Sequence, residues 1–286
     1  MDRLKCLISM FGLAWMAWAA GPDLDRASKL YNITEFQQSL EVLQAVPNKD
    51  AAVYELMGRD YYGRGEFQKA IEALEKAAVL APGNSGVYLW LGRSYGRRAE
   101  TSSMITAPGF ANKARRFFET AAQLNPANLE AQSDLFEYYL EAPGFLGGGL
   151  DKAEATAAQM GRISPSEGQW AEAKLAEKRK ESSSAEAHLR RAIELAPQQV
   201  GKLLELARFL TKQGRYQEAD QSFERAEQVA PNDARVVFAR AESYVKTHRN
   251  LEVARNLLKR YMSMDLNAED PPRSEAANLL RQAQGG

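Results

Sequence analysis

The chain has 286 residues, of which 45% are hydrophobic and 26% charged, and its 37 basic residues balance its 37 acidic ones. This composition allows a large buried core and excludes an intrinsically disordered chain. A nucleic-acid-binding protein would normally carry a basic excess, so the balanced charge argues against a nucleic-acid partner.

Residues 1–19 have the features of a secretory signal peptide. Arg3 and Lys5 precede an apolar run from Cys6 to Ala19, which is shorter than the roughly 20 residues of a membrane-spanning helix. We therefore expect cleavage near Ala20 and export to the periplasm or outside the cell, with no membrane span left; a retained anchor is the alternative. Cys6 is the only cysteine, so the mature chain would contain no disulfide, thiol nucleophile or cysteine-ligated metal.

A 34-residue unit over 51–84 sets the pattern for the rest of the chain. Gly58 and Ala70 are small where two antiparallel helices would cross closely, and Pro82 ends the second helix. The apolar residues at helical spacing predict one buried stripe, which comprises Tyr54, Met57, Tyr61, Leu74 and Ala77. On these residues the unit resembles the tetratricopeptide repeat (TPR) family. Members of that family are all-helical scaffolds that usually bind other proteins.

The same pattern recurs along the chain. A shortened pair over 23–50 precedes the unit, and further units follow over 85–128, 129–165, 166–199, 200–233 and 234–266. No segment shows the apolar–polar alternation of a strand. A last helix over 273–284 would cover the final apolar face. We therefore predict an all-α fold with a single domain over 20–286. This domain is a right-handed TPR solenoid of about six helix-turn-helix repeats plus a C-terminal capping helix.

Two consecutive units carry extra residues between their helices, and we expect loops over 97–113 and 141–150. Both contain Ala-Pro-Gly-Phe, which predicts a rigid turn followed by an aromatic ring, Phe110 in one loop and Phe145 in the other. Because both insertions fall between first and second helix, the loops should lie side by side on one edge, as part of a binding face. Alternatively, each phenylalanine only packs its loop onto the repeats beneath.

The resemblance also implies where a partner binds. In TPR proteins, positions 2, 5, 9, 12 and 13 of the first helix face the concave groove. This implies groove positions for Glu130 and for the partner-binding candidates Arg59, Arg93, Arg97, Glu137, Glu141 and Arg208, which join Phe110 and Phe145. Glu130, Asp134, Glu137 and Glu141 form an acidic row along one helix. An ion pair between Arg93 and Glu137 is the alternative, and such an exposed pair contributes only about 0 to 1 kcal/mol.

Three features suggest chemistry, and each has a simpler structural explanation. The G-x-S-x-G pattern around Ser94 falls within a predicted helix, whereas a nucleophile elbow needs a strand-to-helix turn. His188 and His248 are too few for a multi-histidine metal site. The run Gly147–Gly149 could offer amides to an anion, but it lacks the residues of a phosphate loop, and Asp151 suits a helix N-cap. We predict no catalytic residue, no cofactor and no metal.

The sequence therefore predicts an exported, non-catalytic scaffold that binds another protein or peptide through the concave groove and the two expanded loops. A TPR-supported enzyme, or an accessory subunit that acts on an envelope substrate through the glycine-rich loops, is the alternative. A stable partner without turnover would favour the scaffold. Activity abolished by one loop substitution would favour the enzyme.

Overall fold

The computed structural model describes residues 21–268 and 270–285. The predicted signal peptide over 1–19 and its expected exit at Ala20 lie outside the described residues. Within them, the chain forms fifteen α-helices and one short 3-10 helix, and no strand. None of these helices is both long and apolar enough to cross a membrane.

The helices form hairpins in chain order, seven pairs followed by a single helix. The pairs are α1 (Gly21–Asn32) with α2 (Phe36–Ala45), α3 (Ala51–Gly63) with α4 (Phe67–Leu80), α5 (Ser85–Glu100) with α6 (Ala107–Leu124), α7 (Leu129–Glu141) with α8 (Leu150–Ile163), α9 (Pro165–Lys178) with α10 (Ser182–Leu195), α11 (Val200–Lys212) with α12 (Tyr216–Val229), and α13 (Ala234–Lys246) with α14 (Leu251–Met262). The 3-10 helix η1 (Gly144–Leu146) lies between α7 and α8, and α15 (Arg273–Gly285) ends the described chain.

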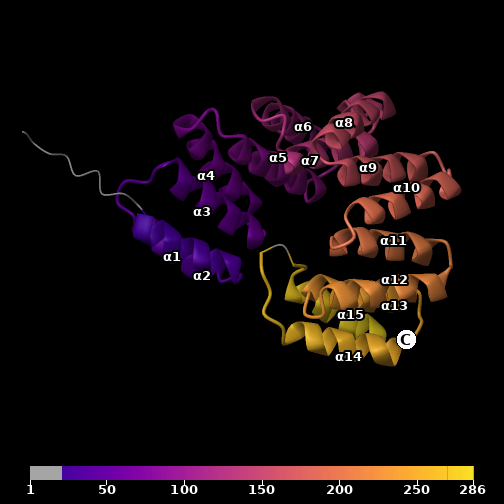
Figure 1. Ribbon diagram of the computed structural model, residues 1–286. Coiled ribbons are helices and arrows are strands. Elements are labelled where there is room, and N and C mark those ends of the chain that lie inside the picture. Colours follow the sequence, from indigo (N-terminus) through magenta and orange to yellow (C-terminus); the bar gives the residue numbers. More distant parts are fainter. Residues whose placement is uncertain (1–20, 269, 286) are drawn as a thin grey trace, which may run out of the picture.

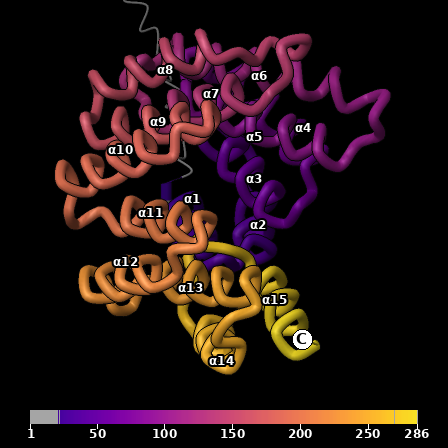
Figure 2. Tube along the Cα trace, turned by 90° about the vertical axis from the view of Figure 1, so that its right-hand side faces the viewer, coloured from indigo at the N-terminus to yellow at the C-terminus, as the bar shows by residue number. Residues whose placement is uncertain are grey.

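Successive pairs stack into a curved solenoid whose first helices form the inner, concave side. Each of the helices α1, α3, α5 and α7 packs against the next first helix, whereas successive second helices such as α4 and α6 do not pack together comparably. Figure 1 and Figure 2 show the solenoid curling until α13, α14 and α15 come round towards α1 and α2. The predicted all-α solenoid is confirmed, and it encloses a groove.

Glycine marks the closest helix crossings, as predicted. A Cβ atom added to Gly58 would lie 2.4 Å from Leu74, and one added to Gly92 would lie 2.4 Å from Phe118. Ala70, opposite Gly58 in the same pair, is fully buried. Any larger side chain at these positions would push the two helices apart and overpack the core.

Short polar side chains begin several of the first helices. Asp50 accepts a hydrogen bond from the amide of Val53 at 2.9 Å, and Asn128 accepts one from Ala131 at 3.1 Å. The N-cap predicted for α8 is wrong, because that helix starts two residues earlier, with Gly149 at the cap and Asp151 inside the first turn. There, Asp151 still interacts favourably with the helix dipole.

The first expansion is mostly helical, so the loop predicted over 97–113 is wrong. Helix α5 continues to Glu100 and α6 begins at Ala107, which leaves residues 101–106 as the connection. Pro108 falls in the first turn of α6, where a missing N–H breaks no helical hydrogen bond. The rings of Phe110 and Phe117 both stack on Tyr95, at centroid distances of 6.2 and 5.3 Å. This aromatic packing gives the added helical turns an apolar face to bury.

The second expansion is a turn, as predicted. Residues 142–149, the glycine turn, contain η1 and pack against α6, where Arg115 lies beside Gly147. All three glycine amides donate within the molecule: Gly147 to the carbonyl of Gly144, Gly148 to that of Pro143, and Gly149 to that of Tyr139. Because these amides already have acceptors, the turn offers no row of free N–H groups to an anion.

Two further features complete the fold. At the C-terminus, α15 buries Ala276, Leu279 and Ala283 against α13 and α14, which covers the last apolar face of the solenoid.

Between α2 and α3 lies a buried carboxylate: Asp60 has no exposed surface and accepts a hydrogen bond from the Ser39 hydroxyl at 2.7 Å. Its second oxygen has no hydrogen-bond partner among the described residues.

Candidate functional site

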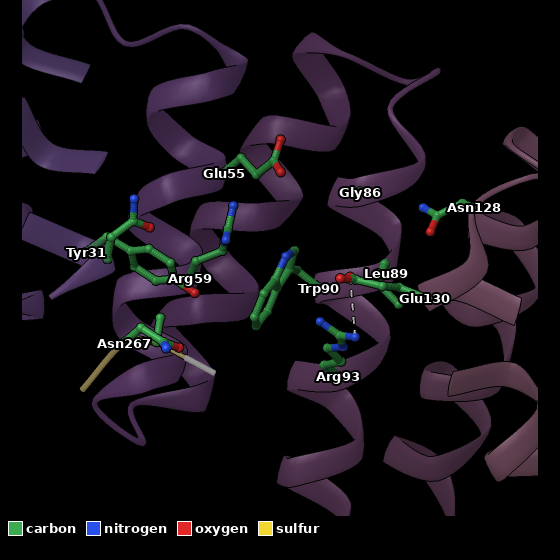
Figure 3. Close-up of a pocket in the computed structure, with 12 residues that line it drawn as sticks. Tyr31, Glu55, Arg59, Gly86, Leu89, Trp90, Arg93, Asn128, Glu130 and Asn267 are labelled. Atoms are coloured by element: carbon green, nitrogen blue, oxygen red, sulfur yellow. Dashed lines mark ion pairs between the residues drawn. The ribbon is translucent and has the colours of Figure 1, made fainter. Parts of the chain in front are cut away.

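The N-terminal part of the concave groove contains a cavity of about 740 Å³, which we call the Arg59 pocket. Helices α1, α3, α5 and α7 supply most of its walls, and the connection between α14 and α15 supplies the rest. Its lining includes Tyr31, Glu55, Arg59, Trp90, Arg93, Asn128 and Asn267 (Figure 3). The pocket therefore brings together three of the groove residues expected from the sequence, Arg59, Arg93 and Glu130.

Arg59 is a cation held between two aromatic rings. Its guanidinium carbon lies 4.6 Å from the ring centroid of Tyr31 and 5.1 Å from that of Trp90. These contacts fix the side chain and are worth about 0.5 to 2 kcal/mol each. Its Nε is buried without an acceptor, and within the described residues Arg59 forms no ion pair. The pocket thus presents a positioned positive charge with unused hydrogen-bonding capacity.

Arg93 also lies over Trp90, at 4.8 Å, but its charge is already neutralised. It pairs with Asp134 at 2.6 Å and with Glu130 at 3.6 Å. The alternative pairing of Arg93 with Glu137 is therefore wrong, because Asp134, one turn nearer the start of α7, reaches the guanidinium first. Burial raises the pKa of Asp134, and the hydrogen bond from Arg93 offsets only part of that effect.

Beyond Arg93 the groove is lined by alternating charges. On α7, Glu137 is exposed and forms no ion pair within the part of the chain that the structure describes. On α9 and α11, Lys174 pairs with Glu205, which also accepts a hydrogen bond from Arg208 at 2.9 Å. Burial acts to raise the pKa of Glu205, but Lys174 and Arg208 together lower it. The carboxylate therefore stays ionised at the centre of this network.

A second aromatic side chain, Trp170 of α9, organises this part of the groove. The ammonium groups of Lys174 and Lys202 lie 5.8 and 5.3 Å from its ring centroid. Burial lowers the pKa of Lys202, and Glu167, whose carboxylate lies 2.5 Å from the ammonium, partly opposes that shift. Cavities of about 430 and 370 Å³ flank Trp170, one beside Glu137 and the other beside Arg208.

The remaining predicted residues lie outside the Arg59 pocket. Arg97 pairs with Glu100 near the end of α5, and Glu141 pairs with Lys178 at 2.9 Å. Phe110 is half-buried under Arg98, whereas Phe145 on the glycine turn is 79% exposed. The two phenylalanines therefore occupy different environments, and Phe145 alone is free to contact a partner.

Sequence reasoning missed several groove residues. Lys174, Glu177 and Lys178 stand at positions 9, 12 and 13 of the unit over 166–199, so the position rule already used would have found them. Trp170 stands at position 5 of the same unit and would have been found in the same way. Trp90 stands at position 6 of the unit over 85–128, outside that rule, and is recognisable only as a large aromatic side chain on a first helix. Their partners come from neighbouring repeats, which the linear pattern does not align.

The residues considered for chemistry have ordinary surroundings. Ser94 is fully buried within α5, and its hydroxyl has no hydrogen-bond partner among the described residues. Nδ1 of His188 lies 2.8 Å from the Gln169 side-chain oxygen, and His248 lies in the turn after α13. Across residues 21–268 and 270–285, no group of three or more histidine, cysteine, aspartate or glutamate side chains could hold a metal ion.

Comparisons with known proteins address the fold. Among solved structures, a TPR protein of Thermus thermophilus is 21% identical and aligns over 67% of this chain and 99% of its own, with a TM-score of 0.55. A tetratricopeptide repeat protein from Parabacteroides merdae is 16% identical over 92% of this chain and 98% of its own, with a TM-score of 0.58. A chain of the APC/C hetero-tetramer Cut9-Hcn1 is 16% identical, with a TM-score of 0.51, over 91% of this chain and 48% of its own.

Sequence comparison gives the family. The chain has no significant match among curated proteins. Two tetratricopeptide repeat models match it, one over residues 51–84 and the other over residues 178–242. Together with the stacked helix pairs, these matches show that the chain belongs to the tetratricopeptide repeat family.

Proposed function

We propose that this protein is a non-catalytic interaction scaffold that binds an extended segment of another protein in its concave groove. The observation that carries the proposal is Arg59, a cation held between Tyr31 and Trp90, without an ion pair among the described residues. A half-buried guanidinium whose Nε is buried without an acceptor is best satisfied by a carboxylate, which can accept two hydrogen bonds from it. Stability alone gives no reason to keep that charge unpaired.

The groove also suggests how charged groups are spaced along the bound segment. Arg59 on α3 and Glu137 on α7 are the two predicted groove residues without an ion pair in the described parts of the chain. First helices α3, α5 and α7 are successive neighbours, so at about 8 to 10 Å per step they are about 16 to 20 Å apart. An extended chain covers that distance in about five or six residues. The expected ligand therefore places an acidic group about five or six residues from a basic one.

The glycine turn provides a second contact in this proposal. It packs against α6 and exposes Phe145, and an exposed aromatic side chain is a common partner anchor. In the first expansion, the exposed residues Met104 and Ile105 at the tip of the connection would take the role first expected of Phe110.

We place the scaffold in the cell envelope or the secreted space because residues 1–19 have the pattern of a signal peptide. N-terminal sequencing of protein recovered outside the cytoplasm should begin at Ala20 or within a residue or two of it. Recovery of folded protein that still starts at Met1 would contradict cleavage.

Affinity capture with matched baits tests the binding site. The wild-type chain, Arg59→Ala and a control, Arg225→Ala on the exposed face of α12, are each incubated with envelope extract, and bound proteins are identified by mass spectrometry. The captured partner is then purified and titrated against each bait. Wild type and Arg225→Ala should bind equally, whereas Arg59→Ala should bind about tenfold more weakly or worse. Equal binding by all three baits would place the site elsewhere.

A further inference from the structure

The hairpin of α5 and α6 is longer than its neighbours. Helix α5 has 16 residues and α6 has 18, whereas the helices of the adjacent pairs, α3, α4, α7 and α8, have 13 or 14. The added residues lie at the end where α5 meets α6, because α4 and α6 both end two residues before a proline, Pro82 and Pro126. At 1.5 Å per residue, the tip of this hairpin projects about 5 to 6 Å beyond the neighbouring helix ends.

Two apolar side chains stand at the apex of this hairpin. Met104 and Ile105 are the middle residues of a turn in which the Thr106 amide donates a hydrogen bond to the Ser103 carbonyl at 3.0 Å. Met104 is 93% exposed and Ile105 is 91% exposed, more than any other large apolar side chain in the described residues. The turn therefore presents both side chains to the solvent, where they add nothing to the core.

The corresponding turns of other pairs have no apolar apex. The connections from α3 to α4, from α9 to α10 and from α11 to α12 consist only of charged or polar residues and glycine, over 64–66, 179–181 and 213–215. The repeat itself therefore needs no apolar residue at this place.

The stem below the apex is well packed. The ring of Phe110, in the first turn of α6, stacks on Tyr95 at a centroid distance of 6.2 Å, and the guanidinium carbon of Arg98 lies 5.2 Å from its centroid. The Thr101 hydroxyl donates a hydrogen bond to the Arg97 carbonyl at 3.0 Å, which holds the end of α5. A helical hairpin thus carries the apex in a defined direction.

Basic side chains surround the stem. Residues 97–116 contain five basic residues and one acidic residue, whereas the whole chain has equal numbers of the two. Arg97 pairs with that acidic residue, Glu100, and Arg115 pairs with Glu119. The other three basic residues form no ion pair within the described parts of the chain: Arg98, Lys113 and Arg116.

The positions of these three cations suit a flat, negatively charged surface. Counted at 1.5 Å per residue from the helix ends at the tip, Arg98 lies about 3 Å back along α5, and Lys113 and Arg116 lie about 9 Å and about 14 Å back along α6. An apolar apex that enters a bilayer by about 5 to 10 Å brings such cations to the level of the lipid phosphate groups. A protein pocket would bind the apex but would leave the cations along the stem without a role.

We propose that the tip of the α5–α6 hairpin docks the protein on a lipid surface that contains anionic lipids. Met104 and Ile105 enter the interface, and the three unpaired cations contact the phosphate groups. None of these residues lines the Arg59 pocket, so docking leaves that pocket free. This inference goes beyond partner binding, and its tests use vesicles without a protein partner. Failure of lipid docking and failure of the proposed function can therefore be distinguished.

The first test places a polarity-sensitive fluorophore, nitrobenzoxadiazole, at the tip. In a full-length Cys6→Ser chain, Ser103→Cys carries the label beside the apex, and Gly83→Cys carries it at the other end of α5. Vesicles of equal parts of phosphatidylcholine and phosphatidylglycerol should raise the fluorescence of the tip label about twofold or more, because the label leaves water. Lipid-bound nitroxide should quench it. The label at position 83 should show neither effect, and vesicles of phosphatidylcholine alone should give a smaller rise at the tip.

The second test alters the tip with the label at position 103 in place. Met104→Ser with Ile105→Ser removes the apolar apex, and Lys113→Gln with Arg116→Gln removes two of the unpaired charges. Each pair of substitutions should lower the response of the tip label at a fixed lipid concentration about threefold or more. Attachment of the chain through any other segment would not produce this dependence.

Matched substitutions elsewhere serve as controls. Val79→Ser with Leu80→Ser removes two exposed apolar side chains at the end of α4. Arg225→Gln with Lys259→Gln removes two exposed basic side chains from α12 and α14. Both control pairs should leave the response of the tip label unchanged.

Circular dichroism melting of each variant controls for loss of fold. A tip label that does not respond to the mixed vesicles, or responds no more than the label at position 83, would overturn the proposal. A full response in either tip variant would also overturn it. If the tip label ignores lipid while Met104→Ser with Ile105→Ser weakens binding of the captured partner, the apex is a protein contact, as considered above, and not a lipid contact.

Discussion

The two expanded pairs, α5–α6 and α7–α8, contain the same tetrapeptide and fold it differently. Ala107–Phe110 begins a helix of 18 residues, whereas Ala142–Phe145 leads into a turn with a 3-10 helix. After Phe110 the chain continues with helix-forming and aromatic residues that pack on Tyr95. After Phe145 it continues with Leu146 and three glycines, and each glycine disfavours a helix by about 1 kcal/mol. The residues that follow the tetrapeptide, and the surface they can cover, decide its conformation.

The largest expected difference in stability between the two expansions comes from replacing one glycine in each of them. A Cβ atom at Gly148 would lie 1.8 Å from the carbonyl oxygen of Ala142, so Gly148→Ala must displace the backbone and should lower the free energy of unfolding by about 2 kcal/mol or more. Gly109, in the first turn of α6, has open space around it, and Gly109→Ala should be neutral or stabilising by up to about 1 kcal/mol. Urea titration measures both values. A harmless Gly148→Ala would mean that the turn is adaptable.

The next largest difference is expected between the effects of replacing Phe110 and Phe145 on the free energy of unfolding. Phe110 stacks on Tyr95 and lies under Arg98, so Phe110→Ala should lower the free energy of unfolding by about 1 to 3 kcal/mol. Phe145 is exposed, and Phe145→Ala should change it by about 0.5 kcal/mol at most. Thermal melting of the two variants side by side provides the comparison. Equal destabilisation would remove the distinction drawn between them.

For partner binding we expect the opposite: Phe145→Ala should have a larger effect on affinity than Phe110→Ala. If the glycine turn is the second contact of the proposed scaffold, Phe145→Ala should weaken binding of the captured partner about three- to tenfold, because an exposed aromatic anchor is lost. Phe110→Ala should leave the affinity nearly unchanged at temperatures where the variant is folded. Isothermal titration with purified partner measures both. Full affinity in Phe145→Ala would confine the interface to the groove.

The smallest expected effect concerns one hydrogen bond in each expanded pair. Removing either bond should change the free energy of unfolding by a similar amount. The Tyr95 hydroxyl donates to Glu75 at 2.9 Å and the Tyr139 hydroxyl donates to Glu119 at 2.8 Å, each joining a first helix to the preceding second helix. Tyr95→Phe and Tyr139→Phe should each lower the free energy of unfolding by about 1 kcal/mol. Urea titration would reveal any large difference between the two, which would mean that the expansions alter the repeats beneath them.

Local spacing was sufficient to predict the helix pairs. Small Gly58 and Ala70 and terminal Pro82 act within a single repeat, so a 34-residue pattern contains the information that positions them. The groove positions of Arg59 and Arg93 followed from the same pattern and the family resemblance. The structure places both in one pocket.

Contacts between repeats were not predictable in the same way. The helical first expansion depends on aromatic stacking between Phe117 and Tyr95, which lie on different helices. The choice of Asp134 over Glu137 as partner of Arg93 depends on side-chain direction across two repeats. The contact of Ala268 with the first helices depends on the curvature of the whole solenoid, to which every repeat contributes.

The buried carboxyl of Asp60 makes the stability of the first helix pairs depend on pH. Burial raises its pKa from 3.8 to about 7, against the opposing effects of the Ser39 hydroxyl and the Arg59 charge. A carboxyl with a higher pKa in the folded state takes up a proton on folding between those values. Its stabilising contribution is therefore complete below about pH 3.8 and is lost as the pH rises through about 7. Helix α3, which carries Arg59, should thus be held to α2 more firmly in a mildly acidic compartment than in an alkaline one.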